Sequence, residues 1–256
     1  MRNVLAIAGR ELRSYFASPI AYFVVGLFAL LFGWFFYTIL VIFSAQSMQM
    51  GQMGFGPQGV NVNQMMVRPL LLNTSVVALF FLPMITMRTF AEEKRSGTFE
   101  LLLTSPVTDF QIVMGKFLGA LALYALMLAV TLLNIGMLFA YGNPEWKQIA
   151  TSYLGLLLMG GSFLSIGLFF SSLTRNQIVA VSLTFATLLL LWVVNWAGDS
   201  ASPLVRAVLE ALSITDHFDD FSKGVVDTKH VVYYLSFITF GLFLTAKSVD
   251  SERWRG

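Results

Sequence analysis

Six apolar stretches, each near the length that crosses a lipid bilayer, constrain the fold of this chain more than any other feature. They are residues 19–43, 70–87, 117–141, 149–173, 178–196 and 231–246. At about 1.5 Å per residue, a helix of about 20 residues spans the roughly 30 Å hydrocarbon layer. We therefore expect an all-α membrane protein with six transmembrane helices. The sixth stretch is short, so it would borrow a turn from its flanks.

The composition supports a membrane protein and excludes other classes. The chain is 57% hydrophobic and 12% charged, whereas soluble domains average about 45–50% and about 25%. A net charge of +2 without a basic tract gives no support for nucleic-acid binding. The first apolar stretch is longer than the roughly 7–15 residues of a cleavable signal, so we expect a retained span. The absence of cysteine excludes disulfides and thiolate metal sites.

The distribution of lysine and arginine predicts the orientation. With the N-terminus inside, the inner segments carry eleven of these residues and the outer segments five. The inner set is Arg2, Arg10, Arg13, Arg88, Lys94, Arg95, Lys116, Arg175, Lys247, Arg253 and Arg255, and the outer set is Arg68, Lys147, Arg206, Lys223 and Lys229. By the positive-inside rule, both termini face the cytosol.

Residues 1–17 have the pattern of an amphipathic helix. Apolar side chains recur at helical spacing at Val4, Leu5, Ala8, Leu12 and Tyr15. Arg10 and Arg13 fall elsewhere on the helix surface, as expected of a helix lying in the inner membrane interface. Such a helix either docks on a cytosolic partner or only sets the topology.

The loop at 88–106, between the second and third stretches, is unusual in combining charge with apolar residues. Glu92, Glu93, Lys94 and Arg95 cannot lie in hydrocarbon, so the second helix leaves the membrane near Arg88. We expect Ser96-Gly97 to break that helix. A short helix then follows over residues 98–104, with Glu100 in its first turn, where the helix dipole favours a carboxylate.

That short helix exposes more apolar surface than a solvated loop should. Its apolar residues are Phe99, Leu101, Leu102 and Leu103. A helix outside the membrane with an exposed apolar surface either lies on lipid or fits a groove on another protein. We favour partner docking.

The sequence of residues 92–106, EEKRSGTFELLLTSP, resembles the coupling loop of type-2 ABC exporter (ABC-2) permeases. The resemblance extends over the whole chain and is nearest to the permease subunit of gliding-motility-type ABC transporters. Three further runs carry it: residues 17–22, 167–180 and 217–227. It implies a single ABC-2 transmembrane domain over 1–256, with an interfacial helix, a cytosolic coupling helix and a small outer helical insert at 198–229.

The resemblance also implies which residues couple to a separate ATPase. The coupling region would be Glu92, Glu93, Lys94, Arg95, Ser96, Gly97, Thr98, Phe99, Glu100, Leu101, Leu102, Leu103 and Thr104. Phe99 and Leu102 would enter a cleft of the ATPase. Glu93, Arg95 and Glu100 would contact its rim.

Motifs of catalysis are missing from the sequence. There is no Gly-x-x-x-x-Gly-Lys-[Ser/Thr], so ATP and its magnesium would be held by a partner and not by this chain. His-Glu-x-x-His and Gly-x-Ser-x-Gly are also missing, so we predict no catalytic residue and no metal ligand.

Polar residues within the spans are few. None of the six stretches contains Asp or Glu, which disfavours an ion-coupled carrier. Asn134 and Asn195 are candidate pathway residues, although hydrogen bonding between helices is the simpler interpretation. Lys116 lies at a span boundary, where we expect it to extend toward water. Gly115/Gly119 and Gly161/Ser165 predict either close helix packing or a dimer seam.

The outer segments suggest less. The first outer loop, residues 44–68, is rich in methionine, which permits Cu(I) binding, but we favour adaptable apolar contacts. In the insert, Ser202 and Pro203 predict the start of an amphipathic helix. Short helices there would either close an exit or cap the bundle.

Two functions remain from the sequence. The first is the permease of an ABC exporter in the bacterial inner membrane, paired with two ATPase copies and with itself or a sister permease. The second is a membrane anchor that transmits ATPase motion to an envelope assembly. Neither the substrate nor the choice between homodimer and heterodimer follows from the sequence.

Overall fold

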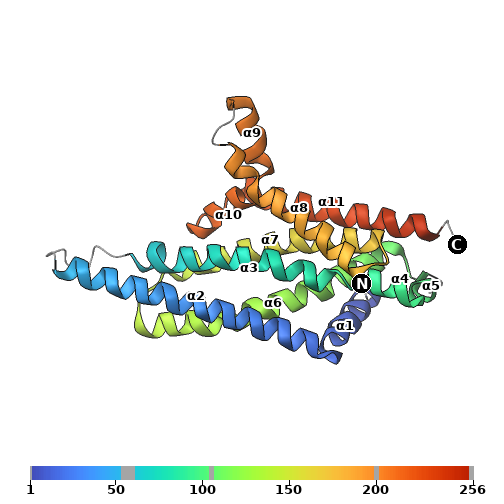
Figure 1. The fold of residues 1–256 in the computed structure, drawn as a ribbon, viewed down its shortest axis with the longest axis horizontal. Coiled ribbons are helices and arrows are strands. Elements are labelled where there is room, and N and C mark those ends of the chain that lie inside the picture. The colour runs from blue at the N-terminus through green and yellow to red at the C-terminus, as the bar shows by residue number, and fades with distance from the viewer. Residues whose placement is uncertain (1, 53–60, 104–106, 199–201, 254–256) are drawn as a thin grey trace.

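The computed structural model describes residues 2–52, 61–103, 107–198 and 202–253, and every regular element in these ranges is helical. Within these ranges six helices are long and apolar enough to cross a membrane, as predicted. They are α2 (Pro19–Gln52), α3 (Arg68–Thr86, preceded by the π-helix η2, Asn63–Val67), α6 (Asp109–Tyr141), α7 (Trp146–Leu173), α8 (Gln177–Gly198) and α11 (Thr228–Arg253). Figure 1 shows most of them running along one long bundle.

Several helices extend beyond the apolar stretches that predicted them. Helix α2 continues to Gln52, and α6 begins at Asp109 rather than at Phe117. A capping box starts α6: the Thr108 side chain accepts a hydrogen bond from the Gln111 backbone, and the Gln111 side chain accepts one from the Thr108 backbone. This satisfies N–H groups at the helix start, so the helix can begin in polar sequence.

The shorter helices form two groups. Helices α1 (Arg2–Ala17), α4 (Ala91–Ser96) and α5 (Thr98–Leu103) lie near one end, where α11 also finishes (Figure 1). The segment between α8 and α11 contains α9 (Pro203–Leu212) and α10 (Ile214–Ser222). Helix α9 begins at Pro203 with Ser202 as its N-cap, as predicted, and it stands away from the bundle against α8.

Helix α7 lies at the centre. In the most apolar stretch of 18 residues in α7, 72% of the residues are buried, compared with 17% in the corresponding stretches of α2 and α8. Small residues allow this crowding. A Cβ atom at Gly160 would lie 2.0 Å from the Tyr124 ring on α6, and one at Gly241 on α11 would lie 2.6 Å from Ser165 Oγ. The Gly161/Ser165 pair therefore marks close helix packing, one of its two predicted meanings.

The other small-residue pair packs against α1. A Cβ atom at Gly115 would lie 2.6 Å from Ile7, and one at Gly119 would lie 2.8 Å from Glu11. Because both positions on α6 are glycine, the backbone of α1 can approach closely. This contact fixes the position of Glu11, on which the site described next depends.

Candidate functional site

Residues 91–103, here called the α4–α5 unit, form two short helices joined at Gly97. Gly97 has φ +75°, in the left-handed region that glycine adopts without the strain of a side chain. The predicted break after Ser96 is therefore present. Helix α5 packs on α4.

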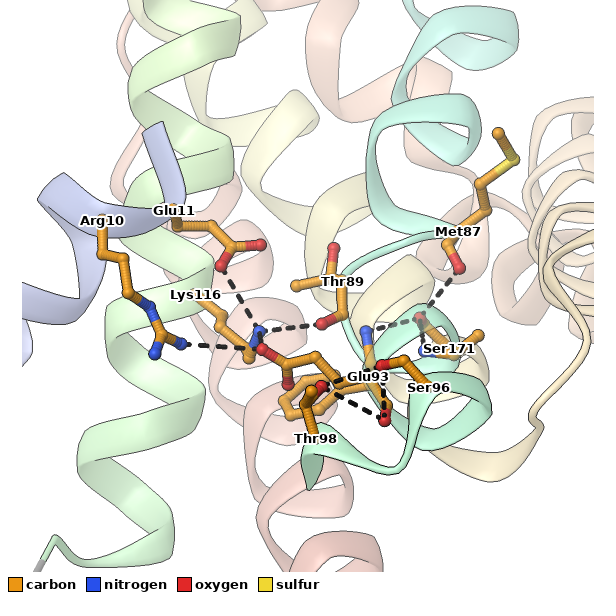
Figure 2. Close-up of polar contacts among 11 residues, drawn as sticks. Arg10, Glu11, Met87, Thr89, Glu93, Ser96, Thr98, Lys116 and Ser171 are labelled. Carbon is orange, nitrogen blue, oxygen red and sulfur yellow. Dashed lines mark hydrogen bonds and ion pairs between the residues drawn. The ribbon is translucent and has the colours of Figure 1, made fainter. Parts of the chain in front are cut away.

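Ser171 on α7 anchors the start of this unit. Its Oγ accepts hydrogen bonds from the backbone N–H groups of Phe90 (3.1 Å) and Ala91 (3.2 Å), and it donates one to the Met87 carbonyl (3.2 Å; Figure 2). Two N–H groups at the beginning of α4, which the helix itself cannot satisfy, thus have a buried partner. The backbone that connects α3 to α4 is fixed to the central helix.

Lys116 is a buried cation that joins three elements. Its Nζ lies 3.3 Å from Glu11 on α1 and 2.8 Å from Glu93 on α4, and it donates a hydrogen bond of 2.8 Å to the Thr89 carbonyl (Figure 2). The Phe90 ring centre lies 5.1 Å away. The side chain is only 1% exposed. The expectation that Lys116 extends toward water is wrong, because its two carboxylate partners lie inside.

The two carboxylates differ in their surroundings. Burial raises the pKa of Glu11, and Lys116 opposes that rise. Glu93 is shared: its Oε1 accepts from Lys116 and lies 3.6 Å from the Arg10 guanidinium. One cation and two carboxylates withdrawn from water depend on each other, since removing one partner leaves buried charge uncompensated.

Lys94 makes a second connection between α4 and the long helices. Its Nζ donates to the Ser172 carbonyl on α7 and forms an ion pair of 2.9 Å with Glu252 near the end of α11. The same Nζ lies 5.3 Å from the Phe99 ring centre. Helix α4 is thereby joined to α7 and α11 as well as to α1 and α6.

Phe99 occupies a different place from the one expected. It is 5% exposed, with its ring edge-to-face on Phe90 at 6.2 Å between centroids. In this conformation it stabilises the α4–α5 unit instead of standing free for a partner cleft. Its ring is covered by Phe90 and Lys94, which lie just before it in the chain, so its burial depends on how α5 folds back on α4, and the apolar pattern does not show this.

The rest of the predicted coupling region is mostly surface. Glu92, Arg95, Ser96, Thr98 and Glu100 are exposed. Nothing is described for the side chains of Leu101, Leu102 and Leu103, and Thr104 lies outside the described residues. Arg10 and Arg13 on α1 are also exposed.

The two asparagines do not join this site. Asn134 is half-buried on α6 and makes no hydrogen bond to any part of the chain that the structure describes. The backbone of Asn195 is helical, and its side chain lies outside the described residues. In the segment expected to be the first outer loop, Met66 lies in η2 and is fully buried in the core.

Sequence reasoning missed Glu11, Lys116, Ser171 and Glu252 as members of this site. The signal for Lys116 was its place between two small residues, which marks a helix face that another helix approaches closely. The partners lie 105 and 23 residues away in the chain, so no local pattern could pair them.

Comparison with known proteins agrees with this architecture. A family model described as "ABC-2 family transporter protein" matches residues 43–195. The chain belongs to this family, and its six apolar helices make it a multi-pass membrane protein.

Two curated relatives carry the name "Probable multidrug ABC transporter permease YbhR", from Escherichia coli strain K12 and from Escherichia coli O157:H7. Each is 37% identical to this chain over 93 residues. That similarity covers 36% of this chain and 25% of the length of each relative.

Proposed function

We propose that this chain is the transmembrane permease subunit of an ABC exporter, driven by ATP that a separate ATPase hydrolyses. The observation that carries the proposal is the attachment of the α4–α5 unit. It has an exposed charged surface, yet Lys116 and Lys94 join it to four long or interfacial helices. A loop that only connects two spans has no need of buried ion pairs.

In this proposal the exposed residues of the unit receive the motion of the ATPase. Glu92, Arg95 and Glu100 provide the contact, and Phe99 keeps α5 fixed on α4. The motion then passes by two routes. One runs through Glu93 and Lys116 to α6 and α1, and the other runs through Lys94 to α7 and α11. Because packed interiors transmit displacement with little compression, a shift of α4 would reorient the spans.

The assembly would contain two ATPase subunits and a second permease chain, identical or a sister. The exposed faces of α2 and α8 support a further membrane partner or lipid contact. ATP and magnesium would bind the ATPase, and this chain would hold no cofactor of its own. The excess of lysine and arginine on the inner segments supports cytosolic termini and, for a bacterial chain, the inner membrane.

The name of the curated relatives supports small amphiphilic compounds as one substrate class. Resemblance to gliding-motility-type permeases supports an alternative, in which the chain transmits ATPase motion to an envelope partner without transport. The position of α9, standing away from the bundle, favours keeping this alternative.

Charge reversal on the α4–α5 unit tests the coupling. The variants Arg95→Glu and Glu100→Lys should reduce co-purification of an ABC ATPase and its stimulation by the permease, because both side chains are exposed and free to contact a partner surface. Lys147→Glu, an exposed reversal near the opposite end of the bundle, is the control. Equal ATPase recovery with all three variants would contradict the proposal.

A transport assay distinguishes export from mechanical transmission. Inside-out vesicles containing the permease and its ATPase should accumulate a fluorescent cationic amphiphile only with hydrolysable ATP. Stimulated ATP hydrolysis without accumulation of any tested amphiphile would favour the alternative.

A further inference from the structure

A pocket of about 340 Å³ lies between α1, the start of α2 and the turn that joins α3 to α4, next to Lys116 and its carboxylates. Its walls differ in character. One wall is apolar, with Ile20, Ala21, Val24, Met84 and Ile85. The other is polar, with Ser14, Tyr15, Arg88, Thr89, Glu92 and Glu93. The volume is at the lower end of the range for ligand sites, roughly 300–1,000 Å³.

The pocket lies where hydrocarbon gives way to water. Helix α2 begins at Pro19 and α3 ends at Thr86, so the apolar wall belongs to the first turns of α2 and the last turn of α3, and the polar wall belongs to segments beyond them. Ile20 and Met84 are 41% and 42% exposed, so the apolar side opens laterally between α2 and α3. A membrane lipid has access to such an opening without leaving the bilayer.

Several polar atoms of this pocket are buried without a hydrogen-bond partner in the part of the chain that the structure describes. They are Tyr15 Oη, Arg88 Nε, Thr89 Oγ1 and Glu93 Oε2. Thr89 is only 3% exposed. Buried polar atoms without partners are uncommon in native structures, and four of them on one pocket point to a missing ligand.

The unpaired oxygen of Glu93 indicates that this ligand carries a positive charge. Its Oε1 already accepts from Lys116, whereas its Oε2 accepts from no described group. Glu92 stands at the rim with a 56% exposed side chain, and its Oε2 lies 3.9 Å from Arg88 Nε. A ligand with N–H donors and positive charge would satisfy Glu93 Oε2.

The other polar groups of the pocket are hydrogen-bond donors, which favour an anion beside that cation. Arg88, whose Nε lies 3.9 Å from Glu92 Oε2, offers the other N–H groups of its guanidinium. Tyr15 and Thr89 offer two neighbouring hydroxyl donors. Burial raises the pKa of Tyr15 more than the neighbouring Thr89 hydroxyl lowers it, so the Tyr15 hydroxyl keeps its proton. Donors and carboxylates thus face the same small space, which suits a zwitterion.

We propose that this pocket binds the headgroup of a zwitterionic ammonium–phosphate lipid, with phosphatidylethanolamine as the simplest such lipid, from the leaflet on the side of α1. The ammonium contacts Glu93 Oε2, and the phosphate accepts from Arg88, Tyr15 and Thr89. The acyl chains are too large for the pocket and lie along the exposed side chains of α2, among them Phe23 and Leu30.

Native mass spectrometry of the full-length chain in detergent tests the proposal. The probes are dioleoyl-phosphatidylethanolamine, dioleoyl-phosphatidylglycerol, which lacks the ammonium, and free phosphoethanolamine, which lacks the chains. The ethanolamine lipid should bind at least about tenfold more tightly than the other two, since loss of a charged contact or of the chains removes a major part of the binding energy.

The double variant Tyr15→Phe/Thr89→Val keeps the shape of the pocket and removes two hydroxyl donors. It should weaken the ethanolamine lipid about tenfold, since each lost hydrogen bond contributes a few-fold. The melting temperature without lipid should change little, because the two hydroxyls have no described partner other than each other and the variant removes both together. Tyr37→Phe on the exposed face of α2 is the matched control and should change neither quantity.

Equal binding of both lipids, or of free phosphoethanolamine, would overturn the proposal. Unchanged lipid affinity in the double variant would overturn it too, by showing that lipid binds elsewhere. All measurements use the permease chain alone, so a negative result here leaves the proposed ATPase coupling standing.

Discussion

At the residue scale, Lys116 explains how a charged side chain is tolerated in an apolar bundle. It is held by Glu11, by Glu93 and by the Thr89 carbonyl, so all its strong contacts are internal. Two of these partners come from short helices at the end of the bundle. The contacts of Lys116 therefore depend on the relative positions of α1, α4 and α6.

Replacing Lys116 with methionine should destabilise the protein by about 3 kcal/mol, because Glu11 and Glu93 would remain partly buried without their cation. Thermal melting of the detergent-solubilised protein measures this change. Lys147→Met, at an exposed position, is the control and should melt like the parent chain. Identical melting of both variants would show that the buried pairs contribute nothing to stability.

The burial of His217 predicts a pH dependence of the stability of α10. Burial lowers its pKa from the usual 6.5, and nearby His230 lowers it further, whereas the Ser213 carbonyl and Asp216 oppose the shift. The unfolded segment therefore binds a proton more readily than the folded one. Its stability is complete above about pH 6.5 and decreases as the pH falls below that value.

Hydrogen exchange over α10 tests this sign. Protection of residues 214–222 should fall between pH 7.5 and pH 5, after correction for the intrinsic exchange rate. His217→Gln should flatten that dependence, because it removes the titrating ring. Greater protection at pH 5 in the parent chain would contradict the burial argument.

At the element scale, glycine determines how closely the helices approach. Gly160 on α7 faces the Tyr124 ring of α6, which is fully buried and whose hydroxyl donates to the Leu156 carbonyl. The ring cannot move away without losing that bond. A Cβ atom added at Gly136 on α6 would meet no described atom of another helix within 4 Å. The two glycines are therefore a matched pair, one packed and one open.

Gly160→Ala should destabilise the protein by about 1–3 kcal/mol through overpacking. Gly136→Ala should be neutral or stabilise it by up to about 1 kcal/mol, because alanine favours the helix. Thermal melting of the two variants side by side measures the difference. A lower melting temperature for Gly136→Ala than for Gly160→Ala would refute the packing described for α7.

At the scale of the whole molecule, α1, α5 and the end of α11 lie near one end of the bundle (Figure 1). The α4–α5 unit is at the same end, so a partner that bound it would lie close to both terminal helices. This arrangement makes the orientation in the membrane a testable property. The chain has no cysteine, so a single introduced thiol is the only one to label.

Ser202→Cys and Ser251→Cys should be labelled from opposite sides. Both positions are exposed, and the Ser202 side chain makes no capping bond that the change would break. A membrane-impermeant maleimide added to intact spheroplasts should label residue 202 and should reach residue 251 only after permeabilisation. The reverse pattern would invert the proposed topology.

Much of this architecture follows from the sequence because its causes are local. Apolar length predicts the six spans, since a backbone in hydrocarbon must satisfy its own hydrogen bonds. Gly97 predicts the break between α4 and α5, since a positive φ favours glycine. Pro203 predicts the start of α9 by the same kind of local rule.

Tertiary structure alone decided the partners. Gly115 and Gly119 indicated a close approach, but only the folded chain identifies α1 as the neighbour. Phe99 could face a partner or the interior, and only the positions of Phe90 and Lys94 bury it. The Lys116 side chain could extend toward water or toward carboxylates, and its direction depends on side chains from distant segments of the chain. Sequence patterns determine where helices form because hydrogen bonds and hydrophobic periodicity act within a few residues. Pairing between helices depends on contacts that exist only after the chain has folded.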